Sequence, residues 1–303
     1  MTRLSLSLIL VIVGCAVACQ RAEVSPVNMQ TREVRDDLGR AVRVPQKIER
    51  AISLAPNLTE MIFALGAGDR LVGVTTYCNF PPGAASIEKI GDTQTPNIEK
   101  IIALRPQVVF VSTASQLEAF MQTLNEQSIA VYVTNPKTLD EVFENLIDLG
   151  DLLGSNRAAE ELVASLAERA ANVRQHAIAP TVPPDSSAAE PRVFVQISNE
   201  PLFTIGRDSF LTELIQQAGG VSVTKDVPSG YPKLSKETAA ALDPDVIILS
   251  DSPDNQRPSA AFKDSKAVKI GRIHRINADI ISRPGPRLVD ALEEIKRMLH
   301  PGN

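Results

Sequence analysis

Side chains of the types that carry out chemistry are few in this chain and lie far apart. The histidines at 176, 274 and 300 belong to three separate segments, whereas a zinc or manganese site needs clustered imidazoles or carboxylates. Cys78 has no histidine near it in the sequence, and the glycines at 66 and 68 begin no phosphate-binding loop. The sequence therefore predicts no enzyme activity, no metal and no cofactor. An enzyme is still the rival class, because residues distant in sequence can meet in a fold.

The composition is that of an ordinary globular protein. Of 303 residues, 44% are hydrophobic and 22% are charged, which allows a sizeable core, and the length predicts two domains rather than one. The formal net charge is -5, and the basic residues form no block with interleaved aromatic residues. We therefore expect no nucleic-acid partner.

The amino-terminal residues have the pattern of a secretory signal. Arg3 precedes the apolar run Leu4–Val13, which is too short to span a membrane. Cys15 and Cys19 each follow a small residue and each resembles the lipidated cysteine of a bacterial lipoprotein. We favour Cys19, which leaves a hydrophobic region of normal length; Cys15 is the alternative, and an uncleaved anchor is the third interpretation. The prediction is a signal peptide over 1–19 and a flexible tether over 20–33, with no cysteine pair left for a structural disulfide.

Two segments of the chain share one pattern of residues at a constant offset. In each, a short helical stretch leads to a Leu-x-Pro break and then to an apolar strand. Four residues of the first segment recur 138 positions later: Glu99, Leu104, Pro106 and Ser112 return as Glu237, Leu242, Pro244 and Ser250. The constant offset indicates an internal duplication of an αβ unit, and it places Glu99 and Glu237 at equivalent sites.

A second pair of segments supports the duplication. Ala51–Leu54 has the pattern of a strand that leads into an apolar-periodic helix ending in glycine, and Val193–Ile197 precedes a helix that ends in the same way. In the first of these helices we expect Asn57 to cap the amino terminus and Glu60 to return the hydrogen bond. The alternation over 34–44 predicts a hairpin in front of the first lobe.

One uninterrupted apolar face predicts a long helix between the two halves. The face runs over Arg157–Ala177 without Gly or Pro, and a helix of that length spans roughly 30 Å. The predicted fold is α/β, with two Rossmann-like βαβ lobes, a single long linking helix and a ligand cleft between the lobes. The expected divisions are an amino-terminal lobe over 34–154, the linking helix over 155–178, a Pro/Ser-rich loop over 179–191 and a carboxy-terminal lobe over 192–303.

With these elements in place, the chain resembles the solute-binding proteins of ABC importers whose lobes are bridged by one long helix, the group that carries cobalamin, ferric siderophores and haem. The resemblance runs from about residue 34 to residue 299. It depends on five short stretches taken together, Ser53–Glu60, Tyr77–Pro82, Asn97–Glu99, Leu104–Pro106 and Ser282–Arg287.

This resemblance implies that one exposed glutamate per lobe meets arginines of the membrane permease, and Glu99 and Glu237 match those positions. Each follows a plausible helix cap, Asn97 or Ser235, so that its carboxylate also faces the positive end of a helix dipole. The alternative is that both are ordinary residues of a first helical turn, which contribute only ~0.3 to 1 kcal/mol to helix stability.

The resemblance also implies a set of ligand contacts. Tyr77, Phe203 and Tyr231 match aromatic positions of the cobalamin binders, and Asp279 and Arg283 match two polar ones. Flat rings offer a bulky ligand contact area at low entropy cost, and an Asp with an Arg can bind amides, a phosphate or a carboxylate. The cobalamin binders have tryptophans where this chain has Thr93 and Ser112, and the chain contains no tryptophan. The alternative for each residue is a packing or surface role.

Together these features predict a monomeric lipoprotein on the periplasmic side of the cell envelope. It would capture a cobalamin-like corrinoid and deliver it to a permease dimer with its ATPase. A ferric siderophore or haem is the alternative ligand; an anionic ferric chelate would meet Arg283 and Arg287, with Lys233 nearby. A surface sensor that uses the same fold without a permease is the alternative outside transport.

Overall fold

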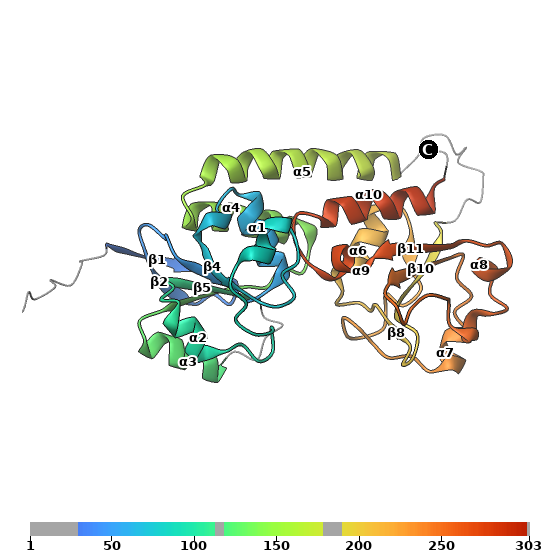
Figure 1. The fold of residues 1–303 in the computed structure, drawn as a ribbon. Helices are drawn as coiled ribbons and strands as arrows, with labels where there is room; N and C mark the ends of the chain where they lie inside the picture. The colour runs from blue at the N-terminus through green and yellow to red at the C-terminus, as the bar shows by residue number, and fades with distance from the viewer. Residues whose placement is uncertain (1–29, 113–117, 178–189, 302–303) are drawn as a thin grey trace, which may run out of the picture.

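The computed structural model describes residues 30–112, 118–177 and 190–301. Two α/β lobes lie side by side beneath one long helix, α5 (Asn156–Ala177), as Figure 1 shows. The predicted fold class, two α/β lobes joined by a single long helix, is confirmed. Within the described ranges, no helix is both long and apolar enough to cross a bilayer. The predicted signal, both candidate lipidation cysteines and most of the Pro/Ser-rich loop lie outside those ranges.

The amino-terminal lobe is built on a four-stranded parallel sheet in the order β4-β3-β5-β6. Its strands are short apolar runs buried on both faces, as expected for a parallel sheet covered by helices. An antiparallel hairpin of β1 and β2 precedes it. The elements are β1 (Thr31–Arg35), β2 (Ala41–Pro45), β3 (Ala51–Ser53), α1 (Pro56–Ala64), β4 (Leu71–Val74), α2 (Ile98–Ala103), β5 (Val108–Ser112), α3 (Glu118–Glu126), β6 (Ala130–Thr134) and α4 (Leu139–Leu152).

The carboxy-terminal lobe repeats this topology. Its parallel strands run in the order β9-β7-β10-β11, and β8 pairs antiparallel with the far end of β7. The elements are β7 (Arg192–Ser198), β8 (Phe203–Thr204), α6 (Phe210–Gln217), β9 (Val221–Ser222), α7 (Lys236–Ala240), β10 (Val246–Asp251), α8 (Lys266–Lys269), β11 (Ile273–Asn277), α9 (Ala278–Ser282) and α10 (Leu288–Leu299).

The backbone preserves the 138-residue duplication in detail. The helices α2 and α7 and the strands β5 and β10 begin at equivalent positions. Between helix and strand, Arg105 (φ 48°) and Asp243 (φ 40°) both adopt the left-handed conformation, which few residues other than glycine enter. Each turn is then closed by an equivalent backbone hydrogen bond of 2.8 Å. Gln107 N–H donates to the carbonyl of Arg50, just before β3, and Asp245 N–H donates to the carbonyl of Arg192, the first residue of β7.

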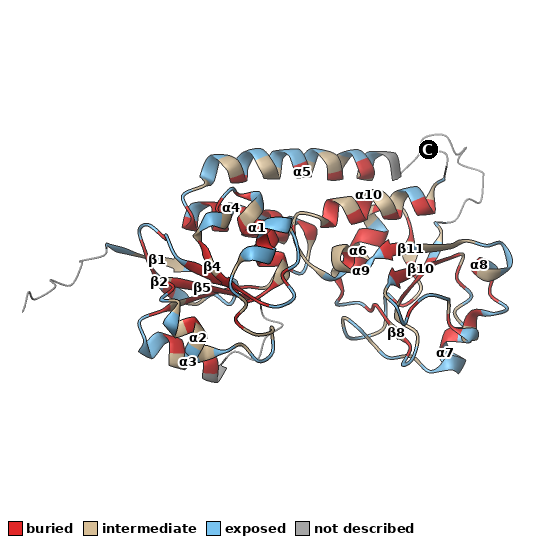
Figure 2. Cartoon of the chain, viewed as in Figure 1, coloured by how far each residue is buried: buried red, intermediate tan, exposed pale blue. Residues whose placement is uncertain are grey.

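Helix α5 joins the lobes through one buried face and several ion pairs. Figure 2 shows its outer side exposed and its inner side against the molecule, and the buried side chains Ala159, Leu166 and Ala170 account for that face. Arg169 donates to Glu293 at 2.8 Å and to Asp290 at 2.6 Å, both on α10. The helix is therefore fixed to the carboxy-terminal lobe by charge as well as by packing.

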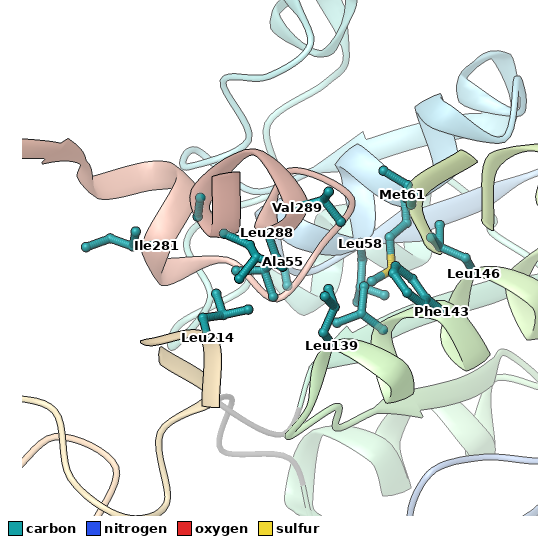
Figure 3. Close-up of a cluster of buried hydrophobic side chains, with 14 of the residues drawn as sticks. Ala55, Leu58, Met61, Leu139, Phe143, Leu146, Leu214, Ile281, Leu288 and Val289 are labelled. Carbon is teal, nitrogen blue, oxygen red and sulfur yellow. The ribbon is translucent and has the colours of Figure 1, made fainter. Parts of the chain in front are cut away.

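One hydrophobic cluster of the described residues runs through both lobes, and each lobe also contains a smaller cluster of its own. Leu58 and Phe143 of the first lobe belong to the same buried cluster as Leu214 and Leu288 of the second. Figure 3 shows side chains from α1 and α4 meeting those of α6 and α10 at this junction. Separating the lobes would expose this apolar surface to water, which is unfavourable in proportion to the area exposed. Large hinge motion is correspondingly costly.

The start of α1 differs from the sequence prediction. Its N-cap position is Ala55, which has no side-chain cap, and Pro56 occupies the first helical turn. Proline is favoured there because an N–H group in the first turn has no acceptor within the helix, so its absence costs no hydrogen bond. Asn57 instead donates from Nδ2 to the Pro284 carbonyl of the other lobe at 3.2 Å. The expected capping box of Asn57 and Glu60 was wrong, and both side chains face the second lobe.

Candidate functional site

A cleft of about 620 Å³ lies between the two lobes. The amino-terminal lobe lines it with residues that follow β3, β4, β5 and β6, and the carboxy-terminal lobe with residues before α6 and after β11. Open α/β sheets place ligand sites beyond the carboxyl ends of their strands, and this cleft lies there in both lobes. Its size is within the ~300 to 1,000 Å³ typical of small-molecule sites.

Two aromatic rings in the cleft remain exposed to solvent. Tyr77 follows β4 and is 56% exposed, and Tyr231, on the opposite lobe, is 43% exposed. Partial burial raises the pKa of Tyr231, and a hydrogen bond with Ser209 opposes part of that shift. The Tyr231 phenol is therefore neutral at physiological pH. Two uncovered rings on facing lobes offer a ligand stacking area from both sides.

The polar base of the cleft is organised around the Arg283 guanidinium, whose side chain is 10% exposed. Its Nη1 donates to Asn79 Oδ1 at 2.7 Å, and its Nη2 donates to Asp279 Oδ1 at 2.7 Å. Asn79 in turn donates to the second oxygen of Asp279 at 2.9 Å. Arg283 and Asp279, which the sequence singled out together, thus form one hydrogen-bonded unit with a residue of the other lobe.

Glu60 is the residue of this site that the sequence analysis missed. Its carboxylate, 2% exposed, accepts from Arg283 at 3.0 Å and from both Nε (2.8 Å) and Nη2 (2.6 Å) of Arg287. The Arg287 guanidinium also lies 4.1 Å from the centre of the Phe80 ring. A buried carboxylate from α1 therefore joins the lobes at the base of the cleft. The signal available in the sequence was a charged residue directly before the apolar pair Met61 and Ile62 of the predicted helix.

The charges at the base of the cleft cancel. Glu60 and Asp279 neutralise Arg283 and Arg287, and the hydrogen bonds that Arg287 donates to Glu60 raise the pKa of Arg287 above its ordinary value. The two arginines that were considered as partners of an anionic ferric chelate are therefore already paired within the protein. Lys233, the third candidate, is exposed and is absent from the described residues that line the cleft.

The remaining candidates are divided between the cleft and its surroundings. Thr93 and Ser112, which stand where the cobalamin binders have tryptophans, line the cleft. Phe203 is half-buried on β8, paired with Ser198 and with Lys233, and the described cleft lining does not include it. Four of the five predicted contact residues thus line one cleft, and Phe203 is not among the described residues that line it.

Glu99 and Glu237 are exposed in the first turns of α2 and α7. Asn97 caps α2 by accepting from Lys100 N–H at 2.9 Å, and Ser235 caps α7 by accepting from Thr238 N–H at 3.0 Å. Hydrogen bonds from its own amide and from Ser235 lower the pKa of Glu237. Figure 1 places both helices on the side of the molecule opposite α5, one on each lobe. The two carboxylates are thus carried by equivalent helices on one side.

Cys78 and His274 are the described residues of these types whose surroundings are clearest. Cys78 is 1% exposed, and its sulfur accepts from the Thr59 hydroxyl at 3.1 Å. Burial lowers the pKa of His274. Over the described part of the chain, no three His, Cys, Asp or Glu residues are grouped so that they could hold a metal ion.

Two lobes, one rigid linking helix and a ligand-sized cleft between the lobes define a two-lobed solute-binding protein. The chain belongs to the periplasmic binding protein family, whose model matches residues 52–292.

Curated relatives cover most of the chain. It is 31% identical over 254 residues to the vitamin B12-binding protein of Vibrio cholerae, covering 83% of this chain and 89% of the relative. It is 28% identical over 290 residues to YvrC, an uncharacterized ABC transporter substrate-binding lipoprotein of Bacillus subtilis, covering 94% and 88% of the two chains.

Solved structures share the fold. The crystal structure of the periplasmic vitamin B12 binding protein BtuF of Vibrio cholerae aligns with a TM-score of 0.74 at 30% identity, over 84% of this chain and 98% of that one. A periplasmic haem-binding protein of Pseudomonas aeruginosa aligns with a TM-score of 0.73 at 24% identity, over 84% and 94% of the two chains. The second likeness concerns the fold alone.

Proposed function

We propose that this protein is the extracytoplasmic binding component of an ABC importer and that it captures a cobalamin-like corrinoid. The observation that carries the proposal is the cleft itself, with exposed rings of Tyr77 and Tyr231 on facing lobes above a polar, charge-neutral base. A corrinoid is a large flat ring system with many amide groups. Its faces suit the two tyrosines, and its amides suit the acceptor Asp279 and the donor Arg283, which line the cleft. The 31% identity to a vitamin B12-binding protein supports the same ligand.

A ferric siderophore or haem is the second candidate, and one observation favours it. Thr93 and Ser112 bring small hydroxyl side chains to the cleft wall, which removes aromatic stacking area and adds hydrogen-bonding groups. A multiply anionic chelate is disfavoured, because Arg283 and Arg287 are already paired with Glu60 and Asp279. A near-neutral ferric chelate fits this cleft better than a highly charged one.

Delivery to a permease is proposed to depend on Glu99 and Glu237. Both carboxylates are exposed, each lies at the capped start of an equivalent helix, and neither lines the cleft. Arginines on a two-fold symmetric permease dimer could engage one glutamate from each lobe at once. The protein would act as a monomer and without chemistry, and docking would promote release of the ligand.

Attachment to the membrane is proposed to occur through a lipid on Cys19, with Cys15 as the alternative. The apolar run before these cysteines and the small residue before each support a lipoprotein signal. Acyl labelling of Cys19→Ala and Cys15→Ala variants tests this assignment. Retention of the label by both single variants would contradict lipidation of one specific cysteine.

The experiment that tests the ligand is titration of the soluble protein, beginning after residue 19, with cobalamin, cobinamide, haem, a hydroxamate ferric siderophore and a catecholate one. We expect a dissociation constant of micromolar or tighter for the corrinoids, about -8 kcal/mol or stronger. Tight binding of the hydroxamate complex alone would transfer the assignment to the second candidate. Binding of none of the five would overturn the proposal.

A further inference from the structure

Glu60 occupies an unusual place for a carboxylate. It lies in α1 among buried residues that include Leu58, Met61 and Ile62, and it is 4% exposed as a whole residue. A buried charge is costly unless it is paired and hydrogen-bonded. Its side-chain hydrogen-bond partners in the described part of the chain, Arg283 and Arg287, come from the other lobe, 223 and 227 positions away along the chain.

Of the two hydrogen-bond partners of Glu60, Arg283 is the one that lines the cleft. The same Nη1 that donates to Glu60 also donates to Asn79, while Nη2 donates to Asp279 and, at 3.4 Å, to the Tyr77 carbonyl. One planar guanidinium therefore fixes three segments, α1, the loop that carries Tyr77, and α9. Arg283 and Asp279 line the cleft, whereas Glu60 does not appear among its described lining residues.

Removal of the Glu60 charge would leave the two positive charges of Arg283 and Arg287 incompletely neutralised. Arg283 and Arg287 would then share one nearby carboxylate, Asp279, and Arg287 would lose the only acidic partner that the structure gives it. Arg283 already donates to Asp279, which also accepts from Asn79, and it would lose the charged acceptor that holds its Nη1 on the side of α1. The orientation of the Asp279 carboxylate and of the loop that carries Tyr77 would change. No ligand contact would be lost directly, because Glu60 is not among the described residues that line the cleft.

We propose that Glu60 is a positioning residue of the ligand site, which orients Asp279 and the Tyr77–Asn79 loop through Arg283. This inference rests on the proposed function, since it assigns Glu60 a role in ligand affinity. A positioning role differs from a purely structural ion pair in one respect. The effect of Glu60 on ligand affinity is expected to depend on Arg283, the partner that lines the cleft.

The test compares Glu60→Gln with Glu293→Gln in the soluble protein. Glu293 is a matched control, because it accepts two hydrogen bonds from Arg169, both at 2.8 Å, between α10 and α5 and away from the cleft lining. We expect Glu60→Gln to weaken binding of cyanocobalamin at least about tenfold and Glu293→Gln to change it less than about twofold. In an Arg283→Met background, Glu60→Gln should have almost no further effect on affinity. Equal affinity in wild type and Glu60→Gln, or full additivity with Arg283→Met, would overturn the proposal.

A second readout needs no ligand. Hydrogen exchange measured by mass spectrometry should be faster in the peptides covering 75–81 and 278–283 in Glu60→Gln, and unchanged there in Glu293→Gln. If wild-type protein binds no corrinoid or chelate, the proposed function fails while this measurement still decides whether Glu60 orders the site. Unchanged exchange in both peptides would refute the positioning role.

If Glu60→Gln does not fold, the double variant Glu60→Leu with Arg287→Leu replaces it. This variant removes one negative and one positive charge together, which leaves no unpaired buried charge. It keeps Arg283 but deprives it of Glu60, so the same loss of affinity and the same faster exchange are expected. Wild-type values for both would contradict the inference.

Discussion

At the scale of single residues, burial separates side chains of the same type into different roles. Tyr132 is 1% exposed and meets Phe110 edge-on inside the first lobe, whereas Tyr77 and Tyr231 keep 56% and 43% of their surface exposed at the cleft. Cys78 is likewise a buried packing residue. Among the tyrosines, only the two at the cleft have surface that a ligand could cover.

Replacement of Tyr77 by alanine should therefore reduce affinity but not stability. Loss of one stacking ring is expected to weaken corrinoid binding about tenfold, or ~1.4 kcal/mol. The free energy of unfolding should change by less than about 0.5 kcal/mol, because the ring is exposed. Titration calorimetry and urea unfolding measure the two quantities. Tyr132→Ala is the contrasting variant and should cost about 3–5 kcal/mol of stability.

At the scale of elements, an ion-pair cluster links α5 to α10. The Arg169 guanidinium of α5 donates to the carboxylates of Asp290 and Glu293 on α10. The hydrogen bond from Arg169 is the main cause that lowers the pKa of Glu293, and Glu293 is 36% exposed, so solvent screens part of the interaction. Exposed ion pairs of this kind contribute about 0–1 kcal/mol. The hydrophobic face of α5 provides the larger share of its attachment.

The lowered pKa of Glu293 predicts a specific pH dependence. A depressed carboxyl pKa contributes stability that is fully present above the ordinary value of 4.5 and is lost as pH falls through the lowered value. Wild type should be more stable than Glu293→Gln at pH 7, by about 1 kcal/mol at most. The difference should shrink as pH falls below about 4.5. Urea unfolding at pH 7 and pH 3.5 measures it, and a difference that grows toward low pH would contradict the assignment.

At the scale of the whole molecule, the shared core and α5 make the two lobes one unit. The buried cluster that contains Leu58 and Phe143 also contains Leu214 and Leu288 (Figure 3), and Glu60 adds charged contacts beside it. A continuous core of this kind predicts that the lobes unfold together and that ligand capture involves only small motions of one lobe relative to the other.

Leu288→Ala tests the unity of the core. Leu288 is fully buried at the junction, so its truncation should destabilise the protein by about 2–5 kcal/mol. Urea unfolding should still show one transition, with hydrogen exchange rising in peptides of both lobes. Ile270→Ala, at a 56% exposed position, is the control and should be within about 0.5 kcal/mol of wild type. Two separate transitions in the wild-type protein would rule out a single cooperative unit.

The double variant Glu99→Arg with Glu237→Arg tests the docking surface. Transport should be abolished, because both carboxylates that would meet permease arginines become cations. Ligand affinity should stay within about twofold of wild type, since neither residue lines the cleft. Glu160→Arg with Glu168→Arg makes the same change in charge on exposed positions of α5 and should leave uptake intact. Normal uptake by the first variant would refute docking through these glutamates.

Patterns within the sequence were sufficient for the architecture. Three features depend on residues that are near one another or identically spaced: the 138-residue repeat, the uninterrupted apolar face of α5 and the alternating hairpin. Such spacing can be recognised in the sequence without knowing the fold. Of the five contact residues that the resemblance implied, Tyr77, Tyr231, Asp279 and Arg283 line one cleft and Phe203 does not, and the contact of each with a ligand stays a prediction.

Only the tertiary structure decided how the charges at the cleft are used. Glu60 was interpreted as a local capping residue, because its sequence neighbours suit that role, yet its partners are more than 220 residues away. The same long-range pairing neutralises Arg283 and Arg287, which look like free cations in the sequence. Helix signals depend on nearby residues, whereas the pairing of buried charges depends on which lobes meet. The sequence by itself thus determined the two lobes and their linking helix, and the fold determined the electrostatic character of the site between them.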